Sequence, residues 1–314
     1  MTQMKDILVG YTGFVGSNLL AAHKFSLCCN RKNIHEAYGI QPDCLVYSGV
    51  PAEMFLANQN PEADFTLMEQ AMDNIRKIQP KSVVLISTIA VYPDTHGADE
   101  DTVIDAKALS AYGANRLALE HMVEKESGQH LIVRLPAIYG MNLKKNFIYD
   151  YIHFIPAMLT EEKFAQFSQR ESMLKNCYEK QANGFWKCRN VQGTEKKQLQ
   201  DCFRRLGFSA LNFTDSRSVY QFYHLAHLWE HIQIALHHQI PRLNITTPPI
   251  SVAELYQALE QKPFVNELAK TPFNYDLHSK YAQLFGGSDG YFMSRDAELQ
   301  EICQFIRRMK EKEQ

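Results

Sequence analysis

The chain reads Asp6-Ile-Leu-Val-Gly-Tyr-Thr-Gly-Phe-Val-Gly-Ser17 near its N-terminus, and this stretch decides the fold. A short apolar run, Ile7–Val9, leads directly into three glycines spaced G-x-x-G-x-x-G, and an amphipathic segment follows. Strand, glycine turn and helix in this order are typical of a dinucleotide site. Gly10 permits the tight turn, Gly13 lets the backbone approach a pyrophosphate, and Gly16 lets the helix pack closely on the strand.

The start of this helix adds a second reason to expect phosphate binding. Its first N–H groups have no partner within the helix and carry a partial positive charge. The alternative is a glycine-rich turn that binds nothing, but the flanking strand and helix favour the dinucleotide site. The residues expected to contact the cofactor here are Gly10, Thr12, Gly13, Phe14, Val15 and Gly16.

Composition limits the class of protein. The 314 residues are 45% hydrophobic and 22% charged, which is ordinary for a globular protein. A net charge of −2 does not favour nucleic-acid binding. No apolar run approaches a membrane span, and the first residues show no apolar signal region. Seven cysteines without a C-x-x-C pattern are typical of reduced thiols, so we expect a cytoplasmic protein.

The first half alternates strand and helix. Apolar runs predict strands at 7–9, 25–29, 43–48, 82–87 and 130–134, and helical patterns lie between them at 61–78 and 106–126. This rhythm predicts an α/β fold, a Rossmann-type doubly wound parallel sheet with a smaller C-terminal substrate lobe.

The second half is less regular. Residues 141–212 show helical fragments without a clear succession of strands, and 213–237 read as one long aromatic helix. A short strand at 242–246, a capping box at 251–254 and an amphipathic helix at 294–312 follow. We expect a cofactor domain over 1–140 to which 213–247 return, a substrate lobe from 141–212 and 248–293, and a C-terminal helix at 294–314.

Three side chains are candidates for chemistry. Thr88 follows the strand at 82–87, and ligands of open parallel sheets bind beyond the carboxyl ends of the strands. Tyr112 and Arg116 are four residues apart on one helix and share a face. A phenol has an ordinary pKa of about 10, and a nearby cation lowers it. We therefore expect Arg116 to lower the pKa of Tyr112, and Thr88 to hydrogen-bond the substrate oxygen.

Four motifs in this order resemble the extended short-chain dehydrogenase/reductases that act on nucleotide sugars. They are Gly10-x-x-Gly13-Phe-Val-Gly16, Ser87-Thr-Ile-Ala-Val-Tyr92, Tyr112-x-x-x-Arg116 and Val133-Arg-Leu-Pro-Ala-Ile-Tyr-Gly140. The resemblance implies an NAD(P)-dependent oxidoreductase or epimerase in which Thr88 orients the substrate and Tyr112 is the general acid/base. It also implies cofactor contacts from Asn33, Ile34, Ser48, Gly49, Val50, Tyr112, Arg116, Pro136, Ala137 and Ile138.

Two positions depart from the family. Arg116 stands where the family has Lys, and Arg cannot exchange a proton at neutral pH. An NADP(H)-binding sensor or regulatory protein without turnover is therefore the alternative to an enzyme. Ile89 and Ala90 stand where the 4,6-dehydratases of the family carry an acidic pair, so the residues do not favour a dehydratase.

Cofactor choice depends on the end of the second strand. A carboxylate there binds the ribose 2′-hydroxyl of NAD, and Arg or Lys accommodates the 2′-phosphate of NADP. The chain has Asn30, Arg31 and Lys32 at this place and no acid. This favours NADP, with NAD as the second choice, unless both cations belong to a solvated loop.

The resemblance also implies partners. The expected substrate is a small-molecule nucleotide sugar contacted by Thr88, Asn146 and Arg217, the last through the diphosphate. It also implies a homodimer through the helices at 61–78 and 106–126, and the oligomeric state stays open. His224, His227 and His231 recur on one helical face in a zinc-like spacing, but aromatic packing is the commoner role and no metal is expected.

Overall fold

The computed structural model describes residues 5–312 and divides them into two compact units. The first unit contains the described residues up to Leu143, together with Tyr220–Ile250 and Asn274–Glu298. The second unit contains Lys144–Val219, Ser251–Phe273 and the described residues from Leu299 onward.

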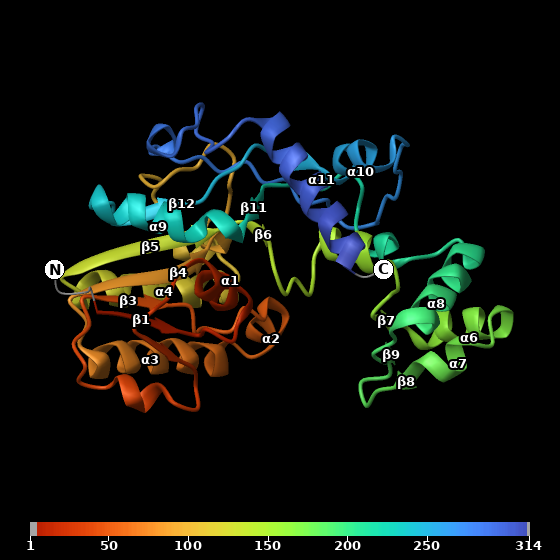
Figure 1. Ribbon diagram of the computed structural model, residues 1–314, viewed down its shortest axis with the longest axis horizontal. Coiled ribbons are helices and arrows are strands. Elements are labelled where there is room, and N and C mark those ends of the chain that lie inside the picture. Colours follow the sequence, from red (N-terminus) through yellow and green to blue (C-terminus); the bar gives the residue numbers. More distant parts are fainter. Residues whose placement is uncertain (1–4, 313–314) are drawn as a thin grey trace. The chain divides into compact units, whose positions relative to one another are not determined.

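The first unit is built on a parallel sheet of six strands (Figure 1). The strands are β1 (Asp6–Val9), β2 (Leu27–Cys29), β3 (Cys44–Tyr47), β4 (Ser82–Thr88), β5 (Gln129–Leu135) and β12 (Arg242–Asn244). Their order is β12-β5-β4-β3-β1-β2, and each neighbouring pair is parallel. After β1 the chain forms β2 on one side of β1, and it then crosses to form β3 on the other side of β1. The edge where β1 and β3 end is therefore the place where open sheets of this kind bind ligands.

Apolar side chains alternate between the two faces of this sheet because successive residues of a strand point to opposite sides. Leu8, Val46 and Val84 pack on one face with helices α1 (Phe14–Ala22) and α9 (Leu228–His237). Ile7 and Leu45 pack on the other face with α3 (Pro61–Ile78) and α4 (Ala111–Glu126). Helices α9 and α3 lie on opposite sides of the sheet in Figure 1. The predicted Rossmann-type doubly wound sheet is confirmed.

Helices α3 and α4 begin at residues that satisfy free backbone N–H groups. The side chain of Asn60 accepts from the N–H of Ala63, and Pro61 occupies the first turn of α3. Ser110 caps α4 in the same way through the N–H of Gly113. The predicted helix at 106–126 therefore starts later than expected, at Ala111.

Residues 213–237 do not form the single helix that the sequence predicted. Ser218 N–H donates to Asp215 O and closes a tight turn. The aromatic residues that follow form strand β11 (Phe222–His224), which pairs in parallel with β6 (Ala137–Tyr139). The helix begins only at Leu228. Residues 219–223, Val-Tyr-Gln-Phe-Tyr, favour a strand, and here tertiary pairing decides the conformation.

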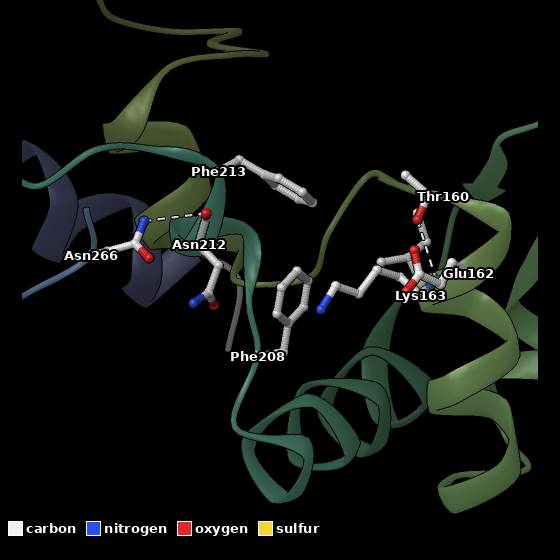
Figure 2. A pocket seen from close by; sticks show the side chains of 8 residues that line it. Thr160, Glu162, Lys163, Phe208, Asn212, Phe213 and Asn266 are labelled. Carbon is white, nitrogen blue, oxygen red and sulfur yellow. Dashed lines mark hydrogen bonds between the residues drawn. The ribbon is translucent and has the colours of Figure 1, made fainter. Parts of the chain in front are cut away.

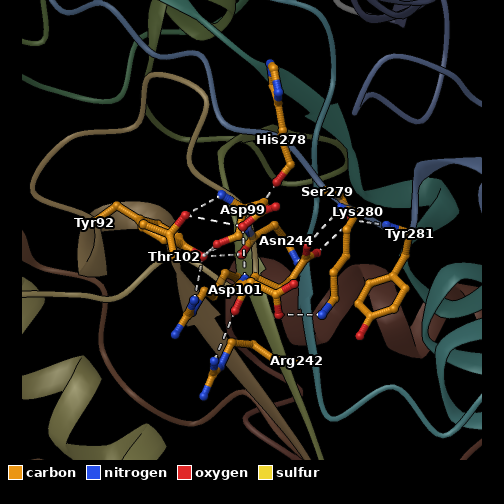
Figure 3. Close-up of polar contacts among 12 residues, drawn as sticks. Tyr92, Asp99, Asp101, Thr102, Arg242, Asn244, His278, Ser279, Lys280 and Tyr281 are labelled. Atoms are coloured by element: carbon orange, nitrogen blue, oxygen red, sulfur yellow. Dashed lines mark hydrogen bonds and ion pairs between the residues drawn. The ribbon is translucent and has the colours of Figure 1, made fainter.

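Residues 274–298 pack with the first unit, whereas the sequence placed 274–293 in the substrate lobe. The buried carboxylate of Glu100 holds this segment. It accepts hydrogen bonds from Ser279 Oγ at 2.6 Å, from Lys280 N at 2.9 Å and from Asn244 N at 2.8 Å. In Figure 3, Ser279, Lys280 and Asn244 lie close to one another. Because one carboxylate joins three segments that are far apart in sequence, no local pattern reveals the connection.

The second unit has a small core of its own. Its antiparallel sheet has the order β7-β9-β8, with β7 (Met158–Leu159), β8 (Tyr178–Lys180) and β9 (Trp186–Cys188). Its helices are α5 (Phe147–His153), α6 (Glu161–Arg170), α7 (Leu174–Cys177), α8 (Gly193–Leu206), α10 (Val252–Glu260) and the part of α11 (Arg295–Lys312) that follows Glu298. Phe164, Phe167 and Phe203 pack together in the core. The sequence missed this sheet because its strands are only two or three residues long.

Across residues 5–312, none of the helices has the length and apolar character needed to cross a lipid bilayer.

Candidate functional site

The glycine turn connects β1 to α1 at the edge where β1 and β3 end. Gly10 has φ +92°, and a Cβ there would lie 2.6 Å from the carbonyl carbon of Ser48, at the end of β3. A Cβ on Gly16 would collide with the carbonyl oxygen of Gly10. The packing of the protein itself therefore requires both glycines.

Gly13 differs from its two neighbours in this motif. It has an ordinary φ of −78°, and only Gly10 O, at 3.2 Å, lies near a Cβ built on it. This contact is tight, but the protein's own packing restricts Gly13 less than it restricts Gly10 and Gly16. A group that passes close to the backbone, as a pyrophosphate does, accounts for the residue.

The first turn of α1 faces the same place. No side-chain hydrogen bond caps this described helix, and its first intrahelical bond joins Ser17 N to Gly13 O at 2.9 Å. The preceding N–H groups, including those of Phe14 and Val15, are the unpaired donors of a helix N-terminus. These donors and the exposed backbone at Gly13 fit a dinucleotide pyrophosphate.

The loop after β2 presents two cations. Asn30 Oδ1 accepts from Lys32 N at 2.8 Å, and Asn33 Oδ1 accepts from Asn30 N at 2.8 Å, so both amide side chains shape the turn. Arg31 and Lys32 are exposed, and neither has an ion-pair partner in the described part of the chain. Gly10 N donates to Cys29 O at 2.7 Å, which places this loop beside the glycine turn.

The other expected cofactor residues surround the same strand ends. Ser48 donates both its N–H and its hydroxyl to Val9 O, at 2.9 Å each, and this ties the end of β3 to that of β1. Gly49 and Val50 continue from there. Pro136, Ala137 and Ile138 follow β5 and are partly exposed. Ile34 opens a short 3-10 turn after Asn33.

Thr88 and Tyr112 lie together at the end of β4. The Thr88 side chain lies close enough to the Tyr112 phenol to lower its pKa, and the Thr88 hydroxyl accepts from Ala90 N at 3.2 Å. Helix α4 approaches this segment closely because Gly113 has no side chain, and a Cβ there would collide with Ala90 O. The structure therefore brings Thr88, which the sequence assigned to substrate orientation, close to Tyr112, which it assigned to proton transfer.

Arg116 lies on the same face of α4 as Tyr112. Its guanidinium carbon is 4.2 Å from the centre of the Tyr112 ring. Its nitrogens donate to the Asp64 carboxylate on α3, and to Pro51 O at 2.6 Å in the loop after β3. Arg116 and Asp64 are 5% and 7% exposed, so this ion pair is buried.

The pKa of Tyr112 is raised above its ordinary value of 10.0, which corrects the expectation that Arg116 lowers it. Burial of the phenol is the largest cause. The charge of Arg116 and the hydrogen bond from Thr88 lower the pKa, but Asp64 opposes them. The sequence identified the cation and missed the anion that accompanies it.

Asp64, Asn58 and Pro51 are the residues of this site that sequence reasoning missed. Asn58 Oδ1, on the short helix α2 (Met54–Gln59), accepts from Tyr112 N at 3.0 Å. Asp64 lies in the first turn of α3, where acidic residues are common because they favour the helix dipole. This ordinary position gives no sign that Asp64 also binds Arg116, which is 52 residues away.

The second unit holds the other two predicted substrate residues. Asn146 caps α5 by accepting from Tyr149 N at 3.1 Å. Arg217 binds Asp215 at 2.7 Å, Glu267 at 3.1 Å and Leu268 O at 3.1 Å. Two carboxylates and a backbone carbonyl thus bind the guanidinium of Arg217, and its contact with a diphosphate stays a prediction.

A cavity of 560 Å³ lies within the second unit, and none of the predicted site residues lines it. Figure 2 shows the Lys163 side chain extending toward Phe208, with Phe213 beside that ring. The Lys163 ammonium is 5.3 Å from the centre of the Phe208 ring. The residues around the cavity are Leu159, Thr160, Glu162, Lys163, Phe208, Asn212, Phe213 and Asn266.

The three histidines that share a zinc-like spacing take part in aromatic contacts. His231 Nδ1 is 2.8 Å from the Tyr223 hydroxyl, and its ring packs edge-on against Phe285 and Phe292. His224 stacks on Tyr139 with ring centres 4.7 Å apart. These contacts give His224 and His231 a packing role within the first unit.

Comparisons with known proteins agree with this geometry. Residues 27–173 match the model of the NAD dependent epimerase/dehydratase family. A search of curated proteins gives no match. Together with the four motifs, this match supports the resemblance to the extended short-chain dehydrogenase/reductases.

Three solved structures illustrate the similarity of fold. A UDP-galactose 4-epimerase has a TM-score of 0.60 and 15% identity, covering 97% of this chain and 99% of that chain. The dTDP-4-dehydrorhamnose reductase from Bacillus anthracis str. Ames, in complex with NADP, has a TM-score of 0.62 and 14% identity, covering 98% and 99%. MoeE5 in complex with UDP-glucose and NAD has a TM-score of 0.59 and 14% identity, covering 97% and 99%.

Proposed function

We propose that this chain is an NADP(H)-preferring oxidoreductase or epimerase that acts on a nucleotide-linked sugar by tyrosine-assisted hydride transfer. One observation carries the proposal. The glycine turn and the Thr88–Tyr112 pair lie at the carboxyl ends of β1 and β4, on one edge of one sheet. The same edge of the sheet can therefore hold the dinucleotide and the side chain that transfers a proton.

The roles follow from what each side chain offers. The first turn of α1 binds the pyrophosphate, and the residues after β3 and β5 line the rest of the cofactor site. Thr88 orients the reacting oxygen of the substrate, and Tyr112 exchanges a proton with it. The nicotinamide, when bound, supplies or accepts the hydride.

The preference for NADP rests on the loop after β2. Arg31 and Lys32 are exposed cations without an ion-pair partner among the described residues, and Asn30 stands where a carboxylate would select NAD. A 2′-phosphate carries up to two negative charges and gains charge-assisted hydrogen bonds from such side chains.

The substrate class rests on the family. The epimerase and the reductase named above have names that refer to sugar nucleotides, and MoeE5 was solved with UDP-glucose. We extend this substrate class to the present chain, with a cytoplasmic location.

We also propose a homodimer through α3 and α4, which light scattering of the purified protein tests.

A second candidate function is an NADP(H) sensor without turnover, and the position of Arg116 favours it. The guanidinium binds Asp64 and Pro51 O and thereby joins α4 to α3 and to the loop after β3. A residue with this role supports the cofactor site even where no reaction follows.

A thermal-shift screen tests both candidates. Ligands that bind the native state raise the unfolding temperature by mass action. We expect NADPH to raise it more than NADH, and at least one UDP-, GDP- or dTDP-linked sugar to raise it further. Conversion of that sugar, with loss of conversion in Tyr112→Phe, selects the enzyme. Binding without conversion selects the sensor, and no shift with any dinucleotide refutes both.

A further inference from the structure

The buried pair of Asp64 and Arg116 differs from the other ion pair between the same two helices. Arg76 on α3 and Glu126 on α4 also meet, at 2.6 Å, but their side chains are 51% and 33% exposed. Asp64 and Arg116 lie in the interior beside Tyr112, and Asn115 Nδ2 donates to the same carboxylate at 2.9 Å. Solvent screens the exposed pair, whereas the buried pair acts on its neighbours with little screening.

The surroundings of Tyr112 disfavour its charged form. The side chain is 6% exposed, which makes a phenolate costly to form. Two charged groups face it, Arg116 from α4 and Asp64 from α3, and their charges are opposite. The contacts from β4 and α2 come from neutral groups, the Thr88 hydroxyl and the Asn58 amide.

We propose that Asp64 offsets the charge of Arg116 beside Tyr112, so that the buried phenol stays protonated, Tyr112 acts as a general acid and the site reduces a carbonyl group on the nucleotide-linked sugar. Asp64 is the positioning residue, because it both holds the guanidinium and offsets its charge. This inference rests on the proposed function and narrows it from oxidoreductase or epimerase to carbonyl reductase.

The direction follows from the proton. Oxidation of an alcohol, which is also the first half of epimerisation, needs Tyr112 as a phenolate to accept the hydroxyl proton. Reduction needs the phenol. In that step the C=O π bond breaks, the carbon gains a hydride from the reduced nicotinamide, and the oxygen gains the Tyr112 proton. The carbonyl is reduced to an alcohol, the nicotinamide is oxidised, and solvent returns a proton to the phenolate.

The experiment follows the protonation of Tyr112 in the protein loaded with NADPH. Tyrosine labelled with ¹³C at the ring carbon that bears oxygen reports ionisation by NMR, and Tyr112→Phe assigns the signal. We expect the Tyr112 signal to stay in its phenol position up to at least pH 9. A signal that titrates below pH 8 overturns the inference.

Asp64→Asn and Glu126→Gln form a matched comparison, since each replaces a carboxylate by an amide in an α3–α4 ion pair. We expect Asp64→Asn to lower the midpoint of Tyr112 by about one pH unit or more, the size of effect that one nearby charge produces. Glu126→Gln leaves the midpoint unchanged. An unchanged midpoint in Asp64→Asn overturns the role given to Asp64.

Activity provides a second readout. With a nucleotide-linked keto sugar, reduction by the wild type stays constant from pH 6 to 9, and in Asp64→Asn it falls at the alkaline end.

If Asp64→Asn does not fold, Asp64→Leu combined with Arg116→Met removes both charges. If the midpoint of the Tyr112 titration then rises by less than one pH unit, the two charges offset each other in the wild type as proposed. A larger rise overturns the inference. A protein that does not bind NADPH refutes the proposed function, whereas one that binds it with an ionised Tyr112 refutes only this inference.

Discussion

Gly16 packs directly against the carbonyl of Gly10, so that the helix after the glycine turn starts at the surface of the first strand. A Cβ built on Gly13, midway between them, would meet only Gly10 O, at 3.2 Å. The two outer glycines therefore serve the fold, and the middle one is available to a ligand.

The first prediction separates these roles. Gly13→Val fills the space assigned to the pyrophosphate, so we expect it to abolish NADPH binding and to lower the unfolding temperature less than Gly16→Ala does. Gly16→Ala is the control for the fold, because its Cβ collides with backbone, at a cost of about 1–3 kcal/mol of stability. Binding by NADPH fluorescence and stability by urea unfolding provide the measurements. Wild-type NADPH affinity in Gly13→Val means that the site lies elsewhere.

A second prediction concerns cofactor choice. Replacement of Arg31 and Lys32 by Ala removes both cations from the loop after β2. We expect NADPH binding to weaken by about 1–3 kcal/mol, the value of lost charge-assisted hydrogen bonds, and NADH binding to change little. Lys24→Ala is the control for a general loss of positive charge. Equal losses for the two dinucleotides contradict the NADP assignment.

Local patterns predicted the part of the fold and site that local geometry determines. Glycine spacing identified the turn from β1 to α1, since Gly13 and Gly16 both face the backbone of Gly10 within the same turn. The four-residue spacing of Tyr112 and Arg116 predicted their shared helical face, and the ring contact confirms it. The place of Thr88 at the end of a strand predicted that it lies in the site, and in the structure it lies beside Tyr112.

Contacts between distant segments were not predictable in this way. Nothing around Asp64 distinguishes it from an ordinary first-turn acid, and only the packing of α3 on α4 brings it to Arg116. Glu100 likewise shows its role only when Ser279 and Asn244 are in place. The rise in the pKa of Tyr112 depends on burial and on Asp64, and neither can be derived from a spacing.

The third prediction tests proton transfer. Tyr112→Phe removes the hydroxyl and keeps the ring that packs against Arg116. Turnover should fall by about 10²–10⁴, the usual contribution of one general acid or base, with NADPH affinity nearly intact. Thr88→Val serves as a companion and should lower turnover through the lost hydrogen bond. Full activity in Tyr112→Phe shows that another group moves the proton.

The fourth prediction concerns pH and Asp150 on α5. Burial raises the pKa of its carboxyl from 3.8 to about 7, and no hydrogen bond or ion pair within residues 5–312 offsets this. The native state thus binds a proton more readily than the unfolded chain, so Asp150 lowers stability progressively as the pH rises from about 4 to about 7.

Asp150→Asn should therefore stabilise the protein on the order of 1–4 kcal/mol at pH 8, and the gain should vanish near pH 4. Glu179→Gln, an exposed carboxylate of the same unit, is the control without such an effect. Urea unfolding at both pH values gives the comparison. A gain that is independent of pH assigns the effect to packing and contradicts the burial argument.

The last prediction is a double-mutant cycle on Arg116 and Asp64. Arg116→Met leaves the Asp64 carboxylate buried without its cation, which costs about 3–5 kcal/mol in comparable pairs. Asp64→Leu leaves the guanidinium in the same condition. The double variant removes both charges and should recover most of the stability, because a buried pair repays little more than its own desolvation. The cycle on Arg76 and Glu126 should give less than about 1 kcal/mol, as exposed pairs do. Urea unfolding of each variant gives the coupling energy. If the losses of stability at Arg116 and Asp64 are additive, the two charges act independently. That result would contradict the proposal that Asp64 offsets the charge of Arg116.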